Sequence, residues 1–277
     1  MTKLGLYLTA FAGFFVITGS ACAEPVGAGV RFAGADGPLQ GVLYRPAEAG
    51  PFPAVIALHG CGGLNLKPGG RELDWAQRLA GAGFTVLFPD SFRSRGLGSQ
   101  CRVRKRAVRA GKERIADAHS ALAYLQTRTD IKAGSITLLG WSNGGATVIN
   151  SVPRRRRPDG LRYDFAAAIG FYPGCRAAER RKQWDTRIRL LILTGLADDW
   201  TPPGPCMALA KRAKAAGDRI EIVLYPGAYH DFDHPDMPLR TRKGRAYSAE
   251  GSGLVHQGTD PAARADAIAR VMRFLPR

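Results

Sequence analysis

Residues 135–151 read Ser-Ile-Thr-Leu-Leu-Gly-Trp-Ser-Asn-Gly-Gly-Ala-Thr-Val-Ile-Asn-Ser, and this stretch decides the expected fold. Residues 136–139 form a short apolar run with β-branched members, which predicts a buried strand because it is too short for a helix. Small and apolar residues with helical spacing follow from Ala146 onward. Between the two lies a Gly-x-Ser-x-Gly pattern centred on Ser142. Strand, Gly-x-Ser-x-Gly and helix in this order are the context of a nucleophile elbow.

The glycines around Ser142 have a physical reason in such a turn. A serine at a sharp strand-to-helix turn sits in a strained backbone conformation, and residues two positions away pack so closely that side chains would clash. The turn lifts the serine hydroxyl above the sheet, where the N-terminus of the next helix favours developing negative charge. The alternative is a Gly-rich turn with an incidental serine, since the chain contains 34 glycines.

The first residues of this 277-residue chain predict a signal peptide over residues 1–23. Lys3 supplies a positive start and residues 4–17 an apolar core, while Ala21-Cys22-Ala23 is a small-residue cleavage site that predicts a cut after Ala23. A lipoprotein signal ending at Cys22 and an uncleaved anchor are alternatives. Removal leaves residues 24–277, long enough for one large core, as a single domain expected in the periplasm or outside the cell.

Export changes how the cysteines are interpreted. Five are encoded, but Cys22 leaves with the signal peptide, so an even number remains: Cys61, Cys101, Cys175 and Cys206. Four cysteines in an oxidising compartment favour two disulfides, for which three pairings are possible. Four free buried thiols are the alternative.

The chain is strongly basic, with a formal net charge of +17. Its basic runs, residues 102–106 and 154–157, are not interleaved with aromatic residues, and no nucleic-acid-binding motif is present. We therefore expect no nucleic-acid partner, and weak contact with anionic envelope components is the remaining use of this charge. Solvated basic faces are the alternative. Beyond the signal peptide no stretch is apolar and long enough to cross a membrane.

Apolar runs alternate with helical patterns along the rest of the chain. After an opening hairpin within residues 24–50, buried strands are predicted at residues 54–58, 84–88, 136–139, 165–171, 189–194 and 219–225. Helices are predicted at residues 71–82, 106–126, 205–216 and 262–274, in addition to the one after Ser142. The polar residues 233–258 predict a flexible loop near the site. This alternation predicts an α/β fold, with a mainly parallel sheet and helices on both faces.

A second Gly-rich loop, His59-Gly60-Cys61-Gly62-Gly63, follows the strand at residues 54–58. Glycines let backbone N–H groups approach a substrate, which an oxyanion hole requires. Enzymes with a nucleophile elbow take one oxyanion N–H from such a loop and one from the residue after the nucleophile. This pattern nominates the amides of Cys61 and Asn143. A tight turn without this role is the alternative.

The nucleophile elbow also fixes the order of its partners. A serine needs a base to take its proton, the base needs an acid to hold its tautomer, and the chain order is serine, acid, histidine. Ser142 is followed by Asp198 and Asp199 after the strand at residues 189–194, and by His230 after the strand at residues 219–225. Asp198 is preferred because it is the first polar residue after that strand, and Asp199 is the alternative.

The other histidines fit less well. His59 belongs to the Gly-rich loop, His119 lies mid-helix, and His234 and His256 lie in the irregular segment. A metal site formed by Asp231, Asp233 and His234 around His230 is an alternative, although the spacing matches no standard zinc pattern.

Three blocks of the sequence together resemble the dienelactone hydrolase family of α/β-hydrolases. They are Gly140-Trp-Ser-Asn-Gly-Gly, Gly195-x-x-Asp198 with Pro202, and Tyr225-Pro-Gly-Ala-Tyr-His230-Asp-Phe, of which the last is the most specific. The likeness runs from about Gly41 to the last helix. The best-known members carry cysteine at the nucleophile position, so this sequence with Ser142 is more similar to the serine-bearing, exported members.

The resemblance implies a single α/β-hydrolase domain that acts on carboxylic esters or lactones and needs neither a cofactor nor a metal. In that fold Cys61 and Cys101 follow consecutive strands at the same sheet edge, and so do Cys175 and Cys206. The implied pairings are therefore Cys61–Cys101 and Cys175–Cys206, which would brace the active-site loops.

A serine hydrolase working on a small-molecule ester or lactone through an acyl-enzyme is the leading interpretation. A peptidase or acyltransferase on the same fold would share the triad, and a non-catalytic basic protein binding an envelope polymer is a third possibility. Arg93, Arg95 and Arg176, in loops on the same edge, are candidates for attracting an acidic substrate, with solvated arginines as the alternative.

Overall fold

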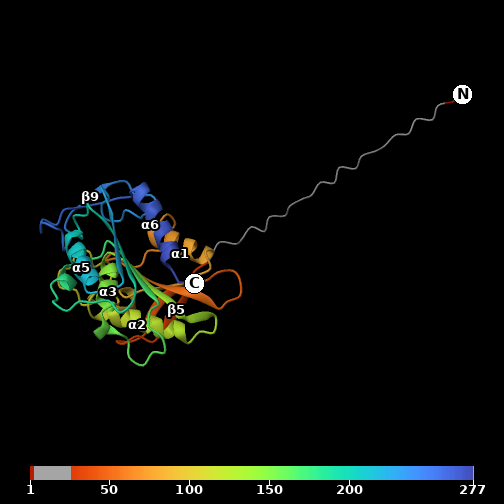
Figure 1. Ribbon diagram of the computed structural model, residues 1–277, viewed down its shortest axis with the longest axis horizontal. Coiled ribbons are helices and arrows are strands. Elements are labelled where there is room, and N and C mark those ends of the chain that lie inside the picture. The colour runs from red at the N-terminus through yellow and green to blue at the C-terminus, as the bar shows by residue number, and fades with distance from the viewer. Residues whose placement is uncertain (3–25, 277) are drawn as a thin grey trace.

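The computed structural model describes residues 1–2 and 26–276 of the chain (Figure 1). The predicted signal peptide with its cleavage site at Ala23 lies outside the described residues. In chain order the elements are β1 (Ala28–Phe32), β2 (Leu39–Tyr44), β3 (Phe52–Leu58), α1 (Arg71–Gly81), β4 (Thr85–Pro89), η1 (Arg93–Arg95), α2 (Glu113–Gln126), β5 (Ile131–Trp141), α3 (Asn143–Ser151), η2 (Arg154–Arg156), β6 (Ala167–Phe171), α4 (Arg176–Glu179), β7 (Leu190–Gly195), α5 (Gly204–Ala215), β8 (Ile220–Tyr225), β9 (Arg240–Arg242), β10 (Val255–Gln257) and α6 (Pro261–Phe274).

Eight strands form one sheet in the order β1-β2-β4-β3-β5-β6-β7-β8. The opening hairpin β1–β2 is antiparallel and also joins β4 antiparallel, whereas every pair from β4 to β8 is parallel. The parallel strands read as nearly continuous apolar runs because both of their faces are covered. The predicted mainly parallel α/β sheet is confirmed.

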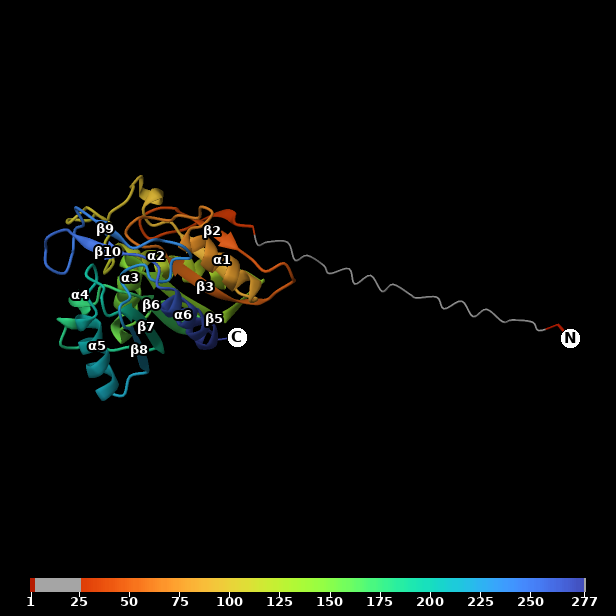
Figure 2. The ribbon, with the colours of Figure 1, turned by 90° about the horizontal axis from the view of Figure 1, so that it is seen from above.

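Two apolar cores lie on opposite faces of this sheet. Helices α2, α3 and α5 contribute to one core and α1 and α6 to the other, as their separate positions in Figures 1 and 2 also show. Alternate residues of one strand serve the two cores, since Ile56 belongs to the first and Ala57 to the second. This arrangement leaves the loops after the parallel strands together at one edge, where ligands bind in open α/β sheets.

The helix expected at residues 106–126 is shorter than predicted, because α2 begins only at Glu113. The backbone before it forms turns and bends. Arg106 Nε donates to the carbonyl oxygens of Gln100 and Val103, and the Arg109 N–H donates to the Glu113 carboxylate in the first helical turn. In these contacts side chains, and not a helical ladder, satisfy the backbone N–H and C=O groups before α2. Hydrophobic spacing alone does not predict such hydrogen bonds.

Residues 233–258 contain more regular structure and more packing contacts than the sequence predicts. The short strands β9 and β10 pair antiparallel within it. Val255 is buried in a small cluster with Cys61, Cys101 and Trp200, and the Ala249 N–H donates to the Asp199 carbonyl oxygen. The segment therefore packs against loops that follow the parallel strands, instead of forming the flexible loop that was predicted. Helix α4 was not predicted, and it is only one turn long.

Among residues 1–2 and 26–276, no helix combines the length and the apolar character required to cross a bilayer.

Candidate active site

Ser142 occupies a sharp turn between β5 and α3. Its backbone has φ 53° and ψ −111°, a conformation that costs energy in a residue with a Cβ. The turn is held on both sides, because the Ser142 N–H donates to Phe171 O at 3.0 Å and the Ala146 N–H donates to Ser142 O at 2.7 Å. This geometry is that of a nucleophile elbow.

Two glycines allow the close packing that this turn requires. A Cβ at Gly144 would lie 2.0 Å from the Leu58 carbonyl oxygen at the end of β3, and a Cβ at Gly140 would lie 2.5 Å from the Gly144 backbone. Neither position can hold a side chain without a shift of the backbone. The Gly-x-Ser-x-Gly spacing is therefore enforced by the contact between α3 and the two central strands.

His230 and Asp198 form a buried pair beyond the ends of β8 and β7. His230 Nδ1 lies 2.8 Å from Asp198 Oδ2. The other carboxylate oxygen, Oδ1, accepts the N–H groups of Trp200 and Thr201 at 2.9 and 2.8 Å. A carboxylate held on both oxygens fixes the orientation of the imidazole and favours the Nδ1–H tautomer.

Asp199 belongs to a different pair. Its Oδ2 atom lies 2.7 Å from His256 Nδ1, and its Oδ1 atom accepts the His256 N–H at 2.8 Å. Asp199 thereby ties the loop after β7 to β10. Of the two neighbouring carboxylates, the structure brings Asp198 to His230.

The environment of His230 favours its protonated form. Burial lowers the pKa of this imidazole, but the charge and the hydrogen bond of Asp198 outweigh burial, so the net pKa lies above the ordinary value of 6.5. The rings of Tyr172 and Trp200 lie on His230 with centroid separations of 4.5 and 4.7 Å. These ring contacts restrict the orientation of the imidazole.

Ser142 and His230 line the same pocket, which we call the histidine pocket and which has a volume of about 510 Å³. In the described part of the chain, no hydrogen bond joins the Ser142 hydroxyl to the His230 ring. Hydrogen bonds between a nucleophile and its base are often long until a substrate binds. The shared pocket is therefore compatible with such a pair.

Cys61 and Asn143 line the same pocket as Ser142. Within the described residues, neither backbone N–H donates a hydrogen bond. Buried Arg114 of α2 joins the two segments that carry them, since it donates to Asn143 Oδ1 at 2.7 Å and to His59 O at 2.9 Å. Arg114 was not predicted as a site residue, and burial lowers its pKa to about 10.

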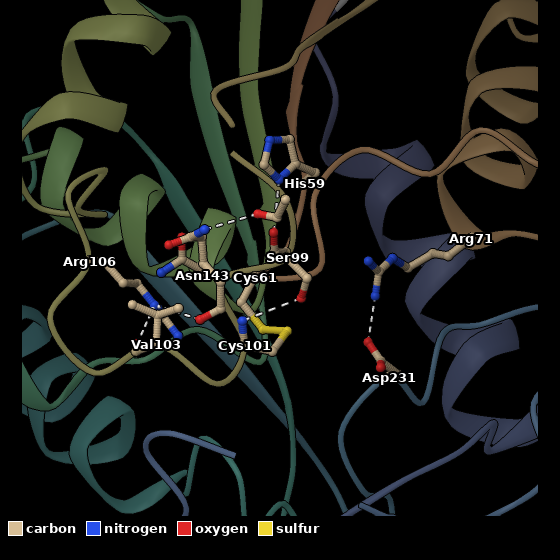
Figure 3. Close-up of a disulfide and its surroundings, with 12 residues drawn as sticks. His59, Cys61, Arg71, Ser99, Cys101, Val103, Arg106, Asn143 and Asp231 are labelled. Carbon is tan, nitrogen blue, oxygen red and sulfur yellow. Dashed lines mark hydrogen bonds and ion pairs between the residues drawn. A yellow bond between two sulfur atoms is a disulfide. The ribbon is translucent and has the colours of Figure 1, made fainter. Parts of the chain in front are cut away.

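Two disulfides stand at this edge, and their pairing is the one implied by the resemblance. Cys61 is joined to Cys101 and Cys175 to Cys206, with Cα–Cα distances of 4.9 and 5.1 Å. Figure 3 shows the first of them beside Asn143. It connects the Gly-rich loop to the segment around residue 101, where the Gln100 N–H also donates to Cys61 O. Two disulfides are typical of proteins from oxidising compartments.

Residues 39–277 match the dienelactone hydrolase family. The chain belongs to the dienelactone hydrolase family. Rat (Rattus norvegicus) acyl-coenzyme A thioesterase 1 is 32% identical over 252 residues, which cover 74% of this chain and 54% of the thioesterase. The chain therefore spans about half the length of that relative. The family membership identifies the protein as a hydrolase with a small-molecule substrate.

Solved structures show the same fold as this family member. A dienelactone hydrolase-like promiscuous phosphotriesterase from metagenomic libraries superposes with a TM-score of 0.63 at 16% identity, covering 91% of this chain and 98% of that one. Thermogutta terrifontis esterase 2, phosphorylated by paraoxon, gives a TM-score of 0.56 at 21% identity, covering 77% and 87%. The expected α/β-hydrolase fold is confirmed.

One site feature of this dienelactone hydrolase family member was not predicted: a buried polar network behind His230. Asp233 accepts the indole N–H groups of Trp75 and Trp141, each at 2.8 Å, and the Tyr172 hydroxyl at 2.6 Å. Burial raises the pKa of Asp233 above its ordinary value, against the opposing charge of Arg71. The only sequence signal was an acidic residue three positions after His230.

Arg71 of α1 completes that network. It donates to the Tyr172 hydroxyl at 2.8 Å, to Asp231 at 2.5 Å and to Glu72 at 2.7 Å, and its bond to Asp231 is drawn in Figure 3. The carboxylates considered for a metal site are therefore engaged by Arg71 and by aromatic donors. Within residues 1–2 and 26–276, no group of three or more His, Cys, Asp or Glu side chains is placed to hold a metal ion.

The three arginines considered for acidic substrates have different surroundings. Arg93 lines the histidine pocket, and Arg176 lines a second pocket that Ser142 also lines. Arg95 instead donates to both carboxylate oxygens of buried Asp117, at 2.8 and 3.0 Å. Arg95 is therefore a structural residue of the loop after β4.

Proposed function

We propose that this protein hydrolyses carboxylic esters or lactones through Ser142, His230 and Asp198. The observation that carries the proposal is the buried His230–Asp198 pair, whose imidazole lines the same pocket as a serine held at an elbow turn. A nucleophile, a base and an orienting acid in this order are the requirements for activating a hydroxyl group. The esterase and thioesterase names of the related proteins support acyl transfer to water.

The chemistry begins when His230 Nε2 removes the Ser142 hydroxyl proton and Oγ bonds to the carbonyl carbon. The carbonyl oxygen becomes an oxyanion that the Cys61 and Asn143 amides stabilise. Collapse of this intermediate breaks the ester bond, and the leaving alcohol takes the proton from His230. Water then attacks the acyl-enzyme by the same route and releases the carboxylic acid and free Ser142.

Asp198 acts through His230. Because Nδ1 donates to Asp198 Oδ2, the Nε2 atom is the one without a proton and can accept it from Ser142. The carboxylate also stabilises the imidazolium that forms, without itself taking the proton. Thr201 holds the carboxylate in place, since its hydroxyl lies 2.9 Å from Asp198 Oδ2.

We also propose that residues 24–277 form one domain that acts in the periplasm or outside the cell after cleavage at Ala23. The two disulfides support this location. Intact-mass analysis of the exported protein tests it, and a mature chain that begins at a residue other than Glu24 contradicts the proposed cut.

Hydrolysis of 4-nitrophenyl butyrate tests the activity. Ser142→Ala and His230→Ala are each expected to lower kcat on the order of 10⁴–10⁶-fold. Ser135→Ala is the matched control, because Ser135 lies on the same strand, outside both pockets. Wild-type cleavage that persists in Ser142→Ala would refute the assignment of the nucleophile.

A further inference from the structure

Ser142 lines two pockets. One is the histidine pocket, and the other, which we call the arginine pocket, has a volume of about 290 Å³. The arginine pocket is lined by Ser142 and Asn143, by Arg106, Arg176 and Arg180, and by both disulfides through Cys61 and Cys175. Its size is at the lower end of the range of about 300–1,000 Å³ that ligand pockets usually show, which suits a short chain.

The position of His230 decides which part of a substrate enters each pocket. In the proposed mechanism the leaving alcohol takes its proton from His230, so it must lie on the side where this imidazole is accessible. His230 lines the histidine pocket and is absent from the lining of the arginine pocket. The acyl chain, which stays on Ser142 after the alcohol leaves, therefore lies in the arginine pocket.

The charge of the arginine pocket is of one sign. All of its charged lining residues are arginines, namely Arg106, Arg176 and Arg180. Among the described residues, no carboxylate forms an ion pair with any of the three. The histidine pocket differs in having mixed charge, because Glu72 and Asp231 line it and neutralise Arg71. Its other cations include Lys67, Arg242 and Arg245, which form no ion pair with a described carboxylate. The arginine pocket thus combines uncompensated positive charge with the N-terminus of α3 at Asn143.

Arg106 is the best-positioned of these cations. Its Nε atom donates to Gln100 O and Val103 O at 3.0 and 3.2 Å, and Figure 3 shows it beside Val103. Its guanidinium carbon lies 4.9 Å from the centre of the Tyr247 ring. The two terminal nitrogens donate to no described residue. Burial lowers the pKa of Arg106, as expected for a cation that is partly removed from water.

We propose that the arginine pocket binds an acyl chain ending in a carboxylate, so that the substrates are half-esters of short dicarboxylic acids. Arg106 forms the inner contact, and exposed Arg176 and Arg180 contribute at the rim. The inference rests on the proposed function, since it specifies the acyl group that Ser142 receives. One water is consumed per half-ester, and the products are the dicarboxylate and the alcohol.

A pair of esters of equal chain length tests the inference. The mono-4-nitrophenyl ester of glutaric acid carries the terminal carboxylate, and 4-nitrophenyl pentanoate lacks it. We expect kcat/KM for the anionic ester to be at least about tenfold higher, the size of one charge-assisted hydrogen bond. The ratio of the two kcat/KM values should decrease with added salt, because ions screen the rim contacts.

Arginine variants then show which residues cause the preference for the anionic ester. Arg106→Gln is expected to lower the ratio about tenfold, with partial retention in Arg106→Lys, and Arg176→Gln and Arg180→Gln about threefold each because they are exposed. Arg31→Gln is the matched control, since this exposed arginine lies on the edge strand β1 and lines neither pocket. The ratio should not change in Arg31→Gln.

Failure of this inference can be distinguished from failure of the proposed function. A wild-type ratio of one or less, with the pentanoate ester still cleaved, overturns the anionic acyl pocket and leaves the proposed function standing. An equal fall in Arg31→Gln also overturns it, because the preference would then come from the overall charge of the protein. If neither ester is cleaved and Ser142 does not react with a fluorophosphonate, the proposed function fails and the inference fails with it.

Discussion

The Asp198 carboxylate accepts a hydrogen bond from His230 Nδ1 at 2.8 Å, and both side chains are buried. These residues lie beyond the ends of two adjacent parallel strands, β7 and β8. The same carboxylate is fixed by two backbone N–H groups of the loop that follows it. The pair is therefore a rigid unit in which the imidazole has one orientation and one tautomer.

Asp198 and Asp199 are adjacent in sequence but should differ in function. Asp198→Asn is expected to lower kcat about 10⁴-fold, because an amide facing Nδ1 favours the wrong tautomer of His230. Asp199→Asn disturbs only the contact with His256, so its kcat should fall less than about tenfold. Steady-state kinetics with a 4-nitrophenyl ester separate the two. Equal losses in both variants would contradict the assignment of Asp198.

The pH dependence of activity should reflect the raised pKa of His230. The base must be neutral to act, so kcat/KM is expected to rise with pH through a midpoint above 6.5. In Asp198→Asn the raising interaction is lost while burial remains, so the His230 pKa should fall. An NMR titration of the His230 ring measures this directly, and a midpoint that does not move would exclude Asp198 as the cause.

The same shift predicts how stability depends on pH. A pKa that is higher in the folded protein means that folding favours the protonated imidazole. The stability contributed by the charged His230–Asp198 pair is therefore fully present below the unfolded-state pKa and is lost as pH rises through the folded pKa, whereas the neutral imidazole keeps its Nδ1–H bond to Asp198.

Removing the Asp233 carboxylate should lower the free energy of unfolding more than removing an exposed carboxylate. Asp233→Ala leaves the N–H groups of Trp75 and Trp141 and the Tyr172 hydroxyl without their acceptor, so the free energy of unfolding should fall by about 3 kcal/mol or more. Exposed Asp236 is the control, and Asp236→Ala should stay within about 0.5 kcal/mol. Urea unfolding measures both. Similar values for the two variants would show that Asp233 is not the centre of the network.

The two disulfides should stabilise the fold to a similar extent but affect catalysis differently. Each closes a loop, of 40 and 31 residues, so removing either should cost about 3–4 kcal/mol in unfolding free energy. The Cys61–Cys101 bond also holds the segment that carries the Cys61 amide. The Cys61→Ser/Cys101→Ser variant should therefore lose kcat about 10²-fold at a temperature where it is folded, as for a lost oxyanion donor. Cys175→Ser/Cys206→Ser, measured at the same folded fraction, is the comparison, and an equal kcat in both variants would contradict this role.

The sheet and the elbow could be predicted from sequence because their signals are local. Buried parallel strands are short apolar runs, and Gly140 and Gly144 mark a contact with neighbouring backbone that admits no side chain. The order Ser142, Asp198, His230 follows from the strands that precede each residue. Local signals do not separate Asp198 from Asp199, because the choice depends on the direction in which each side chain leaves the loop.

The buried network behind His230 could not be predicted because its partners are distant in sequence. Asp233 meets Trp75 from α1 and Trp141 from β5 only after the sheet has assembled. The sequence placed Trp75 in a predicted helix and Trp141 in the elbow motif, and neither pattern indicated a partner for their N–H groups. The start of α2 was missed for a related reason, since Arg106 bonds to carbonyl groups outside any helix.

Intact-mass analysis after treatment with a small fluorophosphonate, followed by peptide mapping, tests the central claim most directly. It examines the activation of Ser142 without requiring knowledge of the substrate. The account predicts one adduct on Ser142 in the wild type, none in Ser142→Ala, and much slower labelling in His230→Ala. No adduct on the folded wild-type protein, or an adduct on another residue, would contradict the proposal that His230 and Asp198 activate Ser142.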